Sequence, residues 1–195
     1  MSNIREVQDA VKCVKKYIPT KFVLMQCTGN YPSKNLDSNL KVMLTYKKNF
    51  KCLYGYSDHT LDFINPVAAT ALGASVYEKH FTLDRKLNGP DHRMSLLPLE
   101  LKKTIEIIRK TKIALGSEEK QVLASEKHNR LRLKKSLVTK SFIKKGEKLD
   151  RNKVAIKRPG TGLRPKEIFS IINYVALKNI QANSVLKRKM LKRIK

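Results

Sequence analysis

The chain has 195 residues, 41% of them hydrophobic and 30% charged, which is the composition of a folded protein rather than a disordered one. No apolar run of about 18 residues is present, which excludes a transmembrane helix. The N-terminus lacks the apolar segment of a signal peptide, and the three widely spaced cysteines match neither a disulfide nor a metal pattern. We therefore expect a cytoplasmic protein.

The formal net charge of +26 is concentrated in the C-terminal part of the chain. Residues 121–195 hold 22 lysines and arginines against 4 acidic residues, whereas residues 1–120 hold 20 against 12. Such an excess suits nucleic acid, an anionic surface or an anionic small substrate. The basic residues are mostly scattered lysines, and no helix-turn-helix, zinc-finger or RNA-stacking signature is present, so nucleic acid is not the expected main partner.

The first half of the chain predicts alternating helices and strands. Residues 3–17 place apolar side chains at spacings of three and four, which predicts a helix capped by Ser2 or Asn3. The apolar run 21–27 predicts a strand that ends in a turn-rich loop. A helix is expected over about 40–49.

The same alternation continues to residue 116. Residues 52–59 and 74–81 predict strands, and residues 63–73 and 98–116 predict helices that end at glycines. Strands that alternate with helices predict a parallel sheet covered by helices, which is an α/β fold.

The character of the sequence changes after residue 117. Residues 119–133 are polar and charged, as in a linker or a solvated helix, and residues 134–195 hold short β-like segments separated by turns. We expect a small, mostly β domain there. The lysine-rich end, 186–195, is most typical of a solvated helix face.

Two of the four histidines, His59 and His80, lie at the C-terminal ends of the predicted strands 52–59 and 74–81. Because side chains alternate along a strand, Ser57 and His59 share one face, and so do Glu78 and His80. Active sites of parallel α/β folds collect at these strand ends. Two neutral imidazoles there suit a divalent metal, although each histidine could equally form only local hydrogen bonds.

Further polar groups surround the two histidines in the sequence. Asp58, Glu78 and Asp91 are candidate ligands, or partners that orient the ligands. The hydroxyls of Ser57 and Thr60 suit either a phosphate or ordinary capping of the chain. The residues alone support an α/β domain with a candidate metal site.

Five motifs in order resemble the N-acetylneuraminate (sialic acid) synthase family: LMQCTGNYPS (24–33), GYSDHT (55–60), ALGASVYEKHFTLDRKLNGPDHRMSLLPLEL (71–101), IRKTKIALGS (108–117) and IKRPGTGL (156–163). The resemblance runs from Met1 to nearly the C-terminus. Other members of that family make legionaminic or pseudaminic acid.

The resemblance implies the C-terminal part of a TIM (β/α)8 barrel followed by an SAF domain, which is similar to type III antifreeze protein. The expected domains are a partial barrel over 1–118 with the last three βα units, a linker over 119–133 and the SAF domain over 134–195. A full barrel takes about 250 residues. The family's first five strands, with their phosphate-binding residues, have no counterpart in this sequence.

The resemblance also implies an activity. The family condenses phosphoenolpyruvate with an N-acetylated hexose, typically N-acetylmannosamine, and forms a nine-carbon 2-keto acid while releasing phosphate. A divalent metal, usually Mn²⁺ with Mg²⁺ or Co²⁺ as alternatives, orients the sugar aldehyde.

The family's site residues are carried over by motif. His59 and His80 are the implied metal ligands, and Ser57 the implied contact to the phosphate of phosphoenolpyruvate. Tyr31 and Asp91 are implied sugar contacts. Arg158 is implied to reach the N-acetyl group from the SAF domain across a homodimer. Gly29 stands where the family has asparagine or serine, and Asn30 is the candidate substitute.

We expect the chain to be inactive by itself, because the phosphate-binding half of the barrel is missing. It is then completed by an N-terminal half on a separate chain, or it is a remnant. The competing hypothesis is a non-catalytic module that binds a sugar or an anion, and the third is a nucleic-acid binder.

Overall fold

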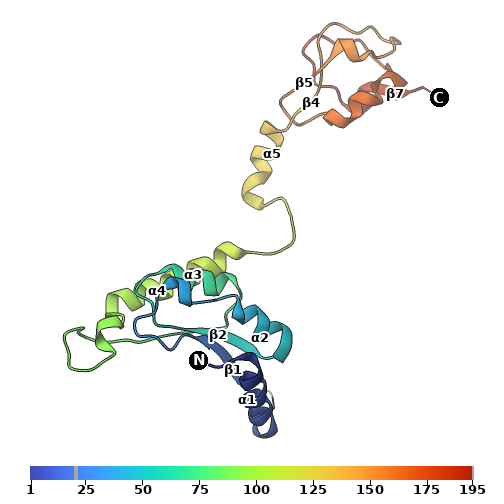
Figure 1. Cartoon of the computed structure of the whole chain (residues 1–195). Coiled ribbons are helices and arrows are strands. Elements are labelled where there is room, and N and C mark those ends of the chain that lie inside the picture. Colours follow the sequence, from blue (N-terminus) through green and yellow to red (C-terminus); the bar gives the residue numbers. More distant parts are fainter. Residues whose placement is uncertain (20–21, 195) are drawn as a thin grey trace. The chain divides into compact units, whose positions relative to one another are not determined.

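The computed structural model describes residues 1–19 and 22–194, which form two compact units, Met1–Glu118 and Glu119–Lys195 (Figure 1). Each unit has a hydrophobic core of its own. Within the described residues, no helix is both long and apolar enough to cross a membrane.

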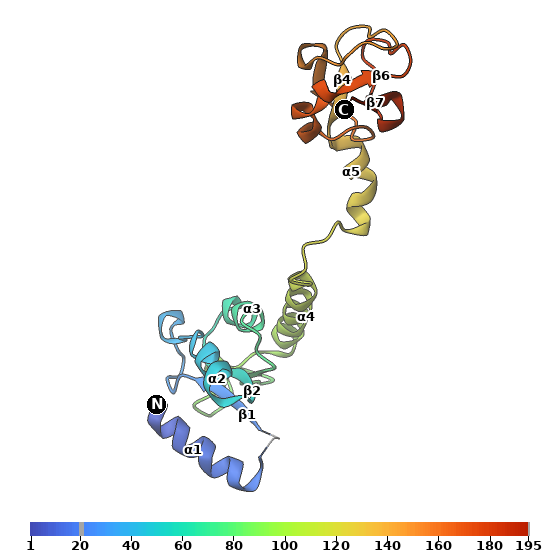
Figure 2. The same cartoon turned by 90° about the vertical axis from the view of Figure 1, so that its right-hand side faces the viewer.

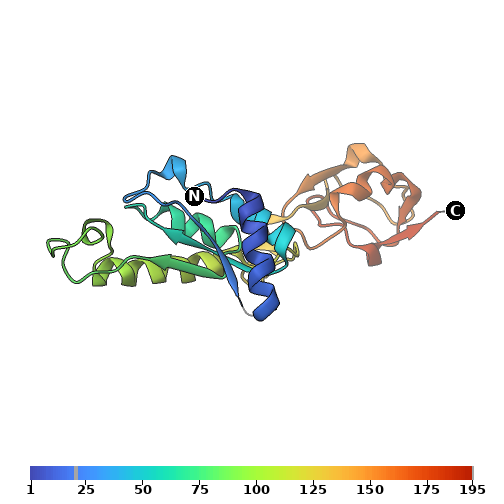
Figure 3. The same cartoon turned by 60° about the horizontal axis from the view of Figure 1, so that its bottom comes forward.

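The chain opens with helix α1, Ile4–Tyr17, at the position that the apolar spacing predicts. Asn3 rather than Ser2 caps it, because the Asn3 side chain accepts hydrogen bonds from the backbone N–H groups of Arg5 and Glu6. Lys15 Nζ donates to the Phe50 carbonyl at 3.0 Å, which ties α1 to the end of the next helix. Figures 2 and 3 show α1 running alongside the first strand.

Three parallel strands form the sheet of the first unit, in the order β1 (Val23–Cys27), β2 (Leu53–Asp58) and β3 (Val76–Lys79). Helix α2 (Val42–Phe50) joins β1 to β2, and α3 (Ile64–Ala71) joins β2 to β3. The predicted alternation, parallel sheet and α/β class are confirmed. The first residue of the predicted strand 21–27 lies outside the described residues.

One face of this sheet carries the core. Tyr54 and Tyr56 of β2 pack there against the helices, together with these buried residues: Val11, Met43, Tyr46, Phe50 and Ala69. The opposite face carries exposed side chains, such as Leu53 at 58% and Val76 at 38% exposure. The sheet is therefore covered by helices on one side and open on the side that faces the interior of a barrel.

Helix α4, Pro98–Leu115, packs against α3. Pro98 occupies the first turn, as predicted, and the helix ends at Gly116, whose positive φ of 58° favours glycine. Glu100 caps the start: it accepts a hydrogen bond from the Leu97 N–H at 2.8 Å and pairs with Arg85 at 2.5 Å.

The first α-helix of the second unit is α5, Lys127–Leu133, which is exposed along its length, as in the solvated helix predicted as one alternative for this segment. Two antiparallel pairs follow: β4 (Ser136–Thr139) with β5 (Val154–Lys157), and β6 (Tyr174–Ala176) with β7 (Leu191–Arg193). The small β region predicted after residue 134 is confirmed. Short 3-10 helices in the two units are η1 Asn35–Asp37, η2 His92–Met94, η3 Ala124–Glu126, η4 Arg151–Lys153, η5 Pro165–Phe169, η6 Ile171–Asn173 and η7 Arg188–Met190.

The prediction of a solvated helix face over 186–195 is wrong for the residues that the structure describes. Leu186 and Leu191 are buried, at 0% and 6% exposure, in the core of the second unit. The chain there forms the 3-10 turn η7 and then β7, which pairs with β6. Tertiary burial of two leucines outweighs the helical propensity of the surrounding lysines.

The core of the second unit predicts that two neighbouring residues contribute very differently to its stability. Ile143 is fully buried, whereas Phe142 is 40% exposed. We expect Ile143→Ala to lower the free energy of unfolding of this unit by about 2–5 kcal/mol, because it leaves a cavity. Phe142→Ala is the control and should cost much less. Hydrogen exchange of peptides from 134–192 measures both, and equal effects would contradict the described core.

The cap of α4 predicts a pH dependence. The N–H of Leu97, and next the Arg85 guanidinium, hold the pKa of Glu100 below its ordinary 4.5. This contribution to stability is present above pH 4.5 and is lost as the pH falls through the lower pKa of the folded state. Urea unfolding should therefore show Glu100→Gln as destabilising at pH 7 and much less so near pH 3. A penalty that does not change with pH would contradict it.

Candidate functional site

The two histidines predicted to act together lie side by side at the carboxyl edge of the sheet. His59 directly follows β2 and His80 directly follows β3. Their ring centroids are 5.1 Å apart, with the ring planes at 67°. His59 is buried, whereas the His80 side chain is 31% exposed. The pair is accessible from one side and held by the fold on the other.

His59 is fixed in one tautomer by a backbone group. Its Nδ1 lies 2.8 Å from the carbonyl oxygen of Thr28. A carbonyl oxygen can only accept, so Nδ1 carries the proton and donates it. The lone pair of His59 is consequently on Nε2, which is the arrangement in which a histidine binds a metal while its other nitrogen is held by a hydrogen bond.

His80 has a carboxylate nearby instead of a backbone carbonyl. Its Nδ1 lies 3.6 Å from Oδ2 of Asp91. The loop that carries Asp91 is tied back at two points: the Ser95 hydroxyl donates to the Asp91 carbonyl at 2.7 Å, and His92 Nδ1 lies 2.8 Å from the Thr82 hydroxyl. The structure thus places Asp91 near His80, for which the sequence suggests it as a candidate partner.

Tyr31 lies across both imidazoles. Its ring centroid is 4.2 Å from that of His59 and 5.8 Å from that of His80, and the residue is 54% exposed. The three rings form one cluster at the open side of the site. Tyr31 is therefore placed to contact a ligand that reaches the histidines.

Ser57 and Glu78 share the face of the sheet that carries the histidines, as the strand alternation predicts. The Ser57 hydroxyl donates to Glu78 Oε1 at 2.6 Å. The Ser57 proton is therefore committed to a carboxylate, and a phosphate would have to replace Glu78 as its acceptor.

Asp58 is not among the groups that face the histidines, so it is not placed to be a metal ligand itself. It lies on the opposite face, fully buried, where it accepts from the Thr60 N–H and the Thr60 hydroxyl at 2.8 Å each. The alternation that places His59 on the open face requires this orientation of its neighbour. The Thr60 hydroxyl is thereby committed to Asp58, which matches the capping alternative rather than the phosphate one.

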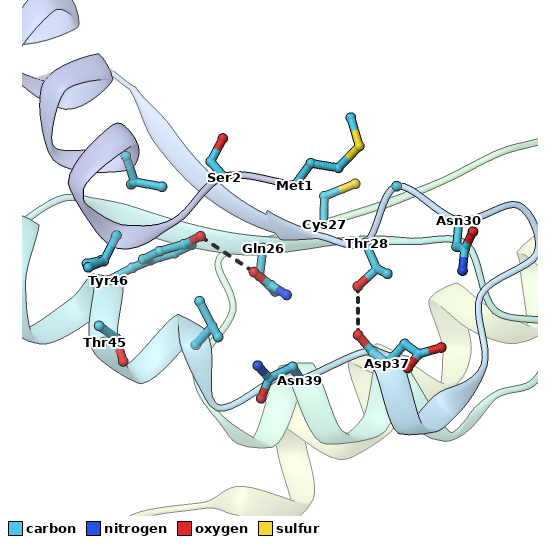
Figure 4. Close-up of a pocket in the computed structure, with 14 residues that line it drawn as sticks. Met1, Ser2, Gln26, Cys27, Thr28, Asn30, Asp37, Asn39, Thr45 and Tyr46 are labelled. Atoms are coloured by element: carbon cyan, nitrogen blue, oxygen red, sulfur yellow. Dashed lines mark hydrogen bonds between the residues drawn. The ribbon is translucent and has the colours of Figure 1, made fainter.

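Asn30 lines a different space. It lines a cavity of about 710 Å³ beside β1, and Figure 4 shows Asn30 there with Gln26, Asp37 and Tyr46. Neither His59 nor His80 lines this cavity. A Cβ at Gly29 would lie 3.4 Å from Cγ of Met1, so a side chain at that position would approach the start of the chain.

Arg158, the remaining site candidate, belongs to the second unit. It is exposed, and its Nε donates to the Leu133 carbonyl at 3.2 Å. This bond anchors Arg158 to the end of α5.

The two imidazoles fit a metal as part of a ligand set. Across 1–19 and 22–194, no three His, Cys, Asp or Glu side chains converge as a metal site. The histidine nitrogens and the nearby Asp91 suit an open site for Mn²⁺, Mg²⁺ or Co²⁺ better than a closed cage of protein ligands. Water, substrate or other protein groups would supply the remaining ligands.

Known proteins resemble this chain along most of its length. Residues 1–120 match the NeuB family and residues 134–192 match the SAF domain. An uncharacterized protein of Methanocaldococcus jannaschii is 42% identical over 89% of this chain and 51% of its own length. The N,N'-diacetyllegionaminic acid synthase of Legionella pneumophila is 38% identical over 95% of this chain and 53% of its own.

A solved structure also resembles this chain. The N-acetylneuraminic acid (sialic acid) synthetase of Leptospira borgpetersenii matches with a TM-score of 0.60 and 34% identity, over 66% of this chain and 45% of the other. The chain spans about half the length of the curated relatives it matches. With a match to 120 of its residues, a partial barrel and an SAF domain, the chain belongs to the NeuB family.

Proposed function

We propose that this chain supplies the metal-binding and sugar-binding part of a nonulosonic acid synthase. The reaction condenses phosphoenolpyruvate with N-acetylmannosamine or a related N-acetylated hexose. The enolpyruvate carbon bonds to the sugar aldehyde carbon, water adds to the former enol carbon, and phosphate leaves by cleavage of its C–O bond. The observation that carries the proposal is the His59–His80 pair, with rings 5.1 Å apart, in a NeuB chain.

The histidines are proposed as the metal ligands. A divalent cation, with Mn²⁺ the first choice, would polarise the aldehyde oxygen as a Lewis acid. The chain's own part is to present two oriented nitrogens. The Thr28 carbonyl keeps the lone pair of His59 on Nε2, and Asp91 lies beside His80.

Substrate contacts are proposed for the groups around the pair. Tyr31 and Asp91 flank the histidines and would contact the sugar. Ser57 would receive the phosphate of phosphoenolpyruvate once Glu78 releases its hydroxyl. Asn30 is proposed for the sugar only as a weaker contact, because it lines the cavity beside β1. Arg158 would act from the SAF domain of a second copy in a homodimer.

Catalysis would require the rest of a barrel. Three parallel strands cannot close, since a TIM barrel takes eight. The strands at both ends of this sheet, β1 and β3, are the places where further strands would add. We therefore propose that an N-terminal half, covalently continuous or on a separate chain, completes the site and provides the phosphate-binding groups.

The metal assignment predicts the effect of two substitutions. His59→Ala and His80→Ala should each weaken Mn²⁺ binding to the 195-residue chain at least about tenfold, because each removes a ligand nitrogen. His128→Ala, in the exposed helix α5, is the matched control and should bind as the parent does. Titration with Mn²⁺ followed by electron paramagnetic resonance measures the affinity. Unchanged binding in both alanine variants would refute the assignment.

The reaction itself is tested by complementation. We expect phosphate release from phosphoenolpyruvate and N-acetylmannosamine only when this chain is combined with the N-terminal half of a related synthase, such as that of Legionella pneumophila. Neither half should be active alone, and His59→Ala with His80→Ala should abolish activity of the mixture. Metal-dependent phosphate release by the purified chain alone would contradict the need for a second half.

A further inference from the structure

A buried charged group lies beneath the two histidines, on the helical face of the sheet. Asp58 and Lys79 have side-chain exposures of 0% and 3%, and Lys79 Nζ lies 3.6 Å from Asp58 Oδ2. Tyr77 donates its hydroxyl to the same carboxylate oxygen. Burial lowers the pKa of Lys79 and raises that of Tyr77.

The two charged residues hold Thr60 from both sides. Asp58 Oδ1 accepts the N–H and the hydroxyl of Thr60, each at 2.8 Å. Lys79 Nζ donates to the Thr60 carbonyl. Both the N–H and the carbonyl of Thr60 are therefore bonded to charged side chains. Thr60 is the residue directly after His59.

The strand register makes this arrangement relevant to the site. Asp58 and Lys79 are direct partners in the parallel pair of β2 and β3. His59 and His80 directly follow these two strands, and alternation turns their side chains to the opposite face. The charged pair and the imidazole pair therefore lie back to back across the same two backbones.

Stability alone does not account for such a pair. Two buried charges lose their hydration, and replacing a buried ion pair by apolar residues is often neutral or stabilising. The best-attested use of buried ionic groups is to specify one register among alternatives. Here the register specified is the one that places the two imidazoles beside each other.

We propose that Asp58, Lys79 and Thr60 form a clamp that sets the spacing of His59 and His80 from the far side of the sheet. Asp58 and Lys79 are positioning residues, because they act through the backbone of their neighbours and touch no substrate. The role in metal binding rests on the proposed function, whereas the role in ring spacing does not.

The test compares Lys79→Met, Asp58→Asn and the double variant in the 195-residue chain. The first readout is the nuclear Overhauser contact between the ring protons of His59 and His80, measured without metal. The second is Mn²⁺ affinity. Thr104→Val is the control: it removes a buried hydroxyl that donates to the Glu100 carbonyl in α4, away from the clamp.

We expect both single variants to lose the contact between the rings and to bind Mn²⁺ at least about tenfold more weakly. The double variant removes the unpaired buried charge and should regain thermal stability, but it should regain neither readout, because the grip on the Thr60 carbonyl is still lost. Thr104→Val should keep both the ring contact and the Mn²⁺ affinity of the parent chain, even where its thermal stability is lower.

Other outcomes separate the two proposals. Parent-like ring contact in the double variant would overturn the clamp and leave Asp58 and Lys79 a purely structural pair. Loss of the ring contact in a chain whose parent binds no Mn²⁺ would support the clamp and refute the metal assignment.

Discussion

The parallel register of β2 and β3 is the constraint on which the rest of the site depends. It sets Ser57 opposite Glu78 and Asp58 opposite Lys79, and it brings His59 and His80 to the same level of the sheet. A shift by one residue would turn each of these side chains to the other face. The Ser57–Glu78 bond on one face and the Asp58–Lys79 pair on the other both favour the observed register.

The two faces of the sheet differ in burial and in accessibility at the ends of β2 and β3. On the helical face, the polar groups are buried and bonded to one another, and burial raises the pKa of Tyr56 to about 12. On the open face, His80, Tyr31 and Asp91 keep part of their surface accessible, whereas His59 is buried. Rigid support and available chemistry thus come from alternate residues of the same two strands, which is how strand ends of α/β enzymes position their sites.

Local patterns were enough to predict much of this arrangement. Helical spacing located α1 and α4, and strand alternation placed Ser57 and His59 on one face. The same alternation implied that Asp58 faces the other way, although its proximity to His59 in sequence suggested a metal partner. Lys79 carried no local signal, because a lysine beside a histidine is ordinary, and only the pairing of two strands shows that it is buried against Asp58. β7 was missed because the two buried leucines of this segment, Leu186 before the strand and Leu191 in it, sit among lysines and arginines.

The open strands at the two ends of the sheet have a consequence for handling the protein. Unpaired strand edges tend to join to those of other copies, and repulsion between copies carrying a formal charge of +26 opposes this. The range of that repulsion is about 10 Å at 0.1 M salt and about 3 Å at 1 M. We therefore expect the chain to stay dispersed at low ionic strength and to associate through these edges more readily at high salt.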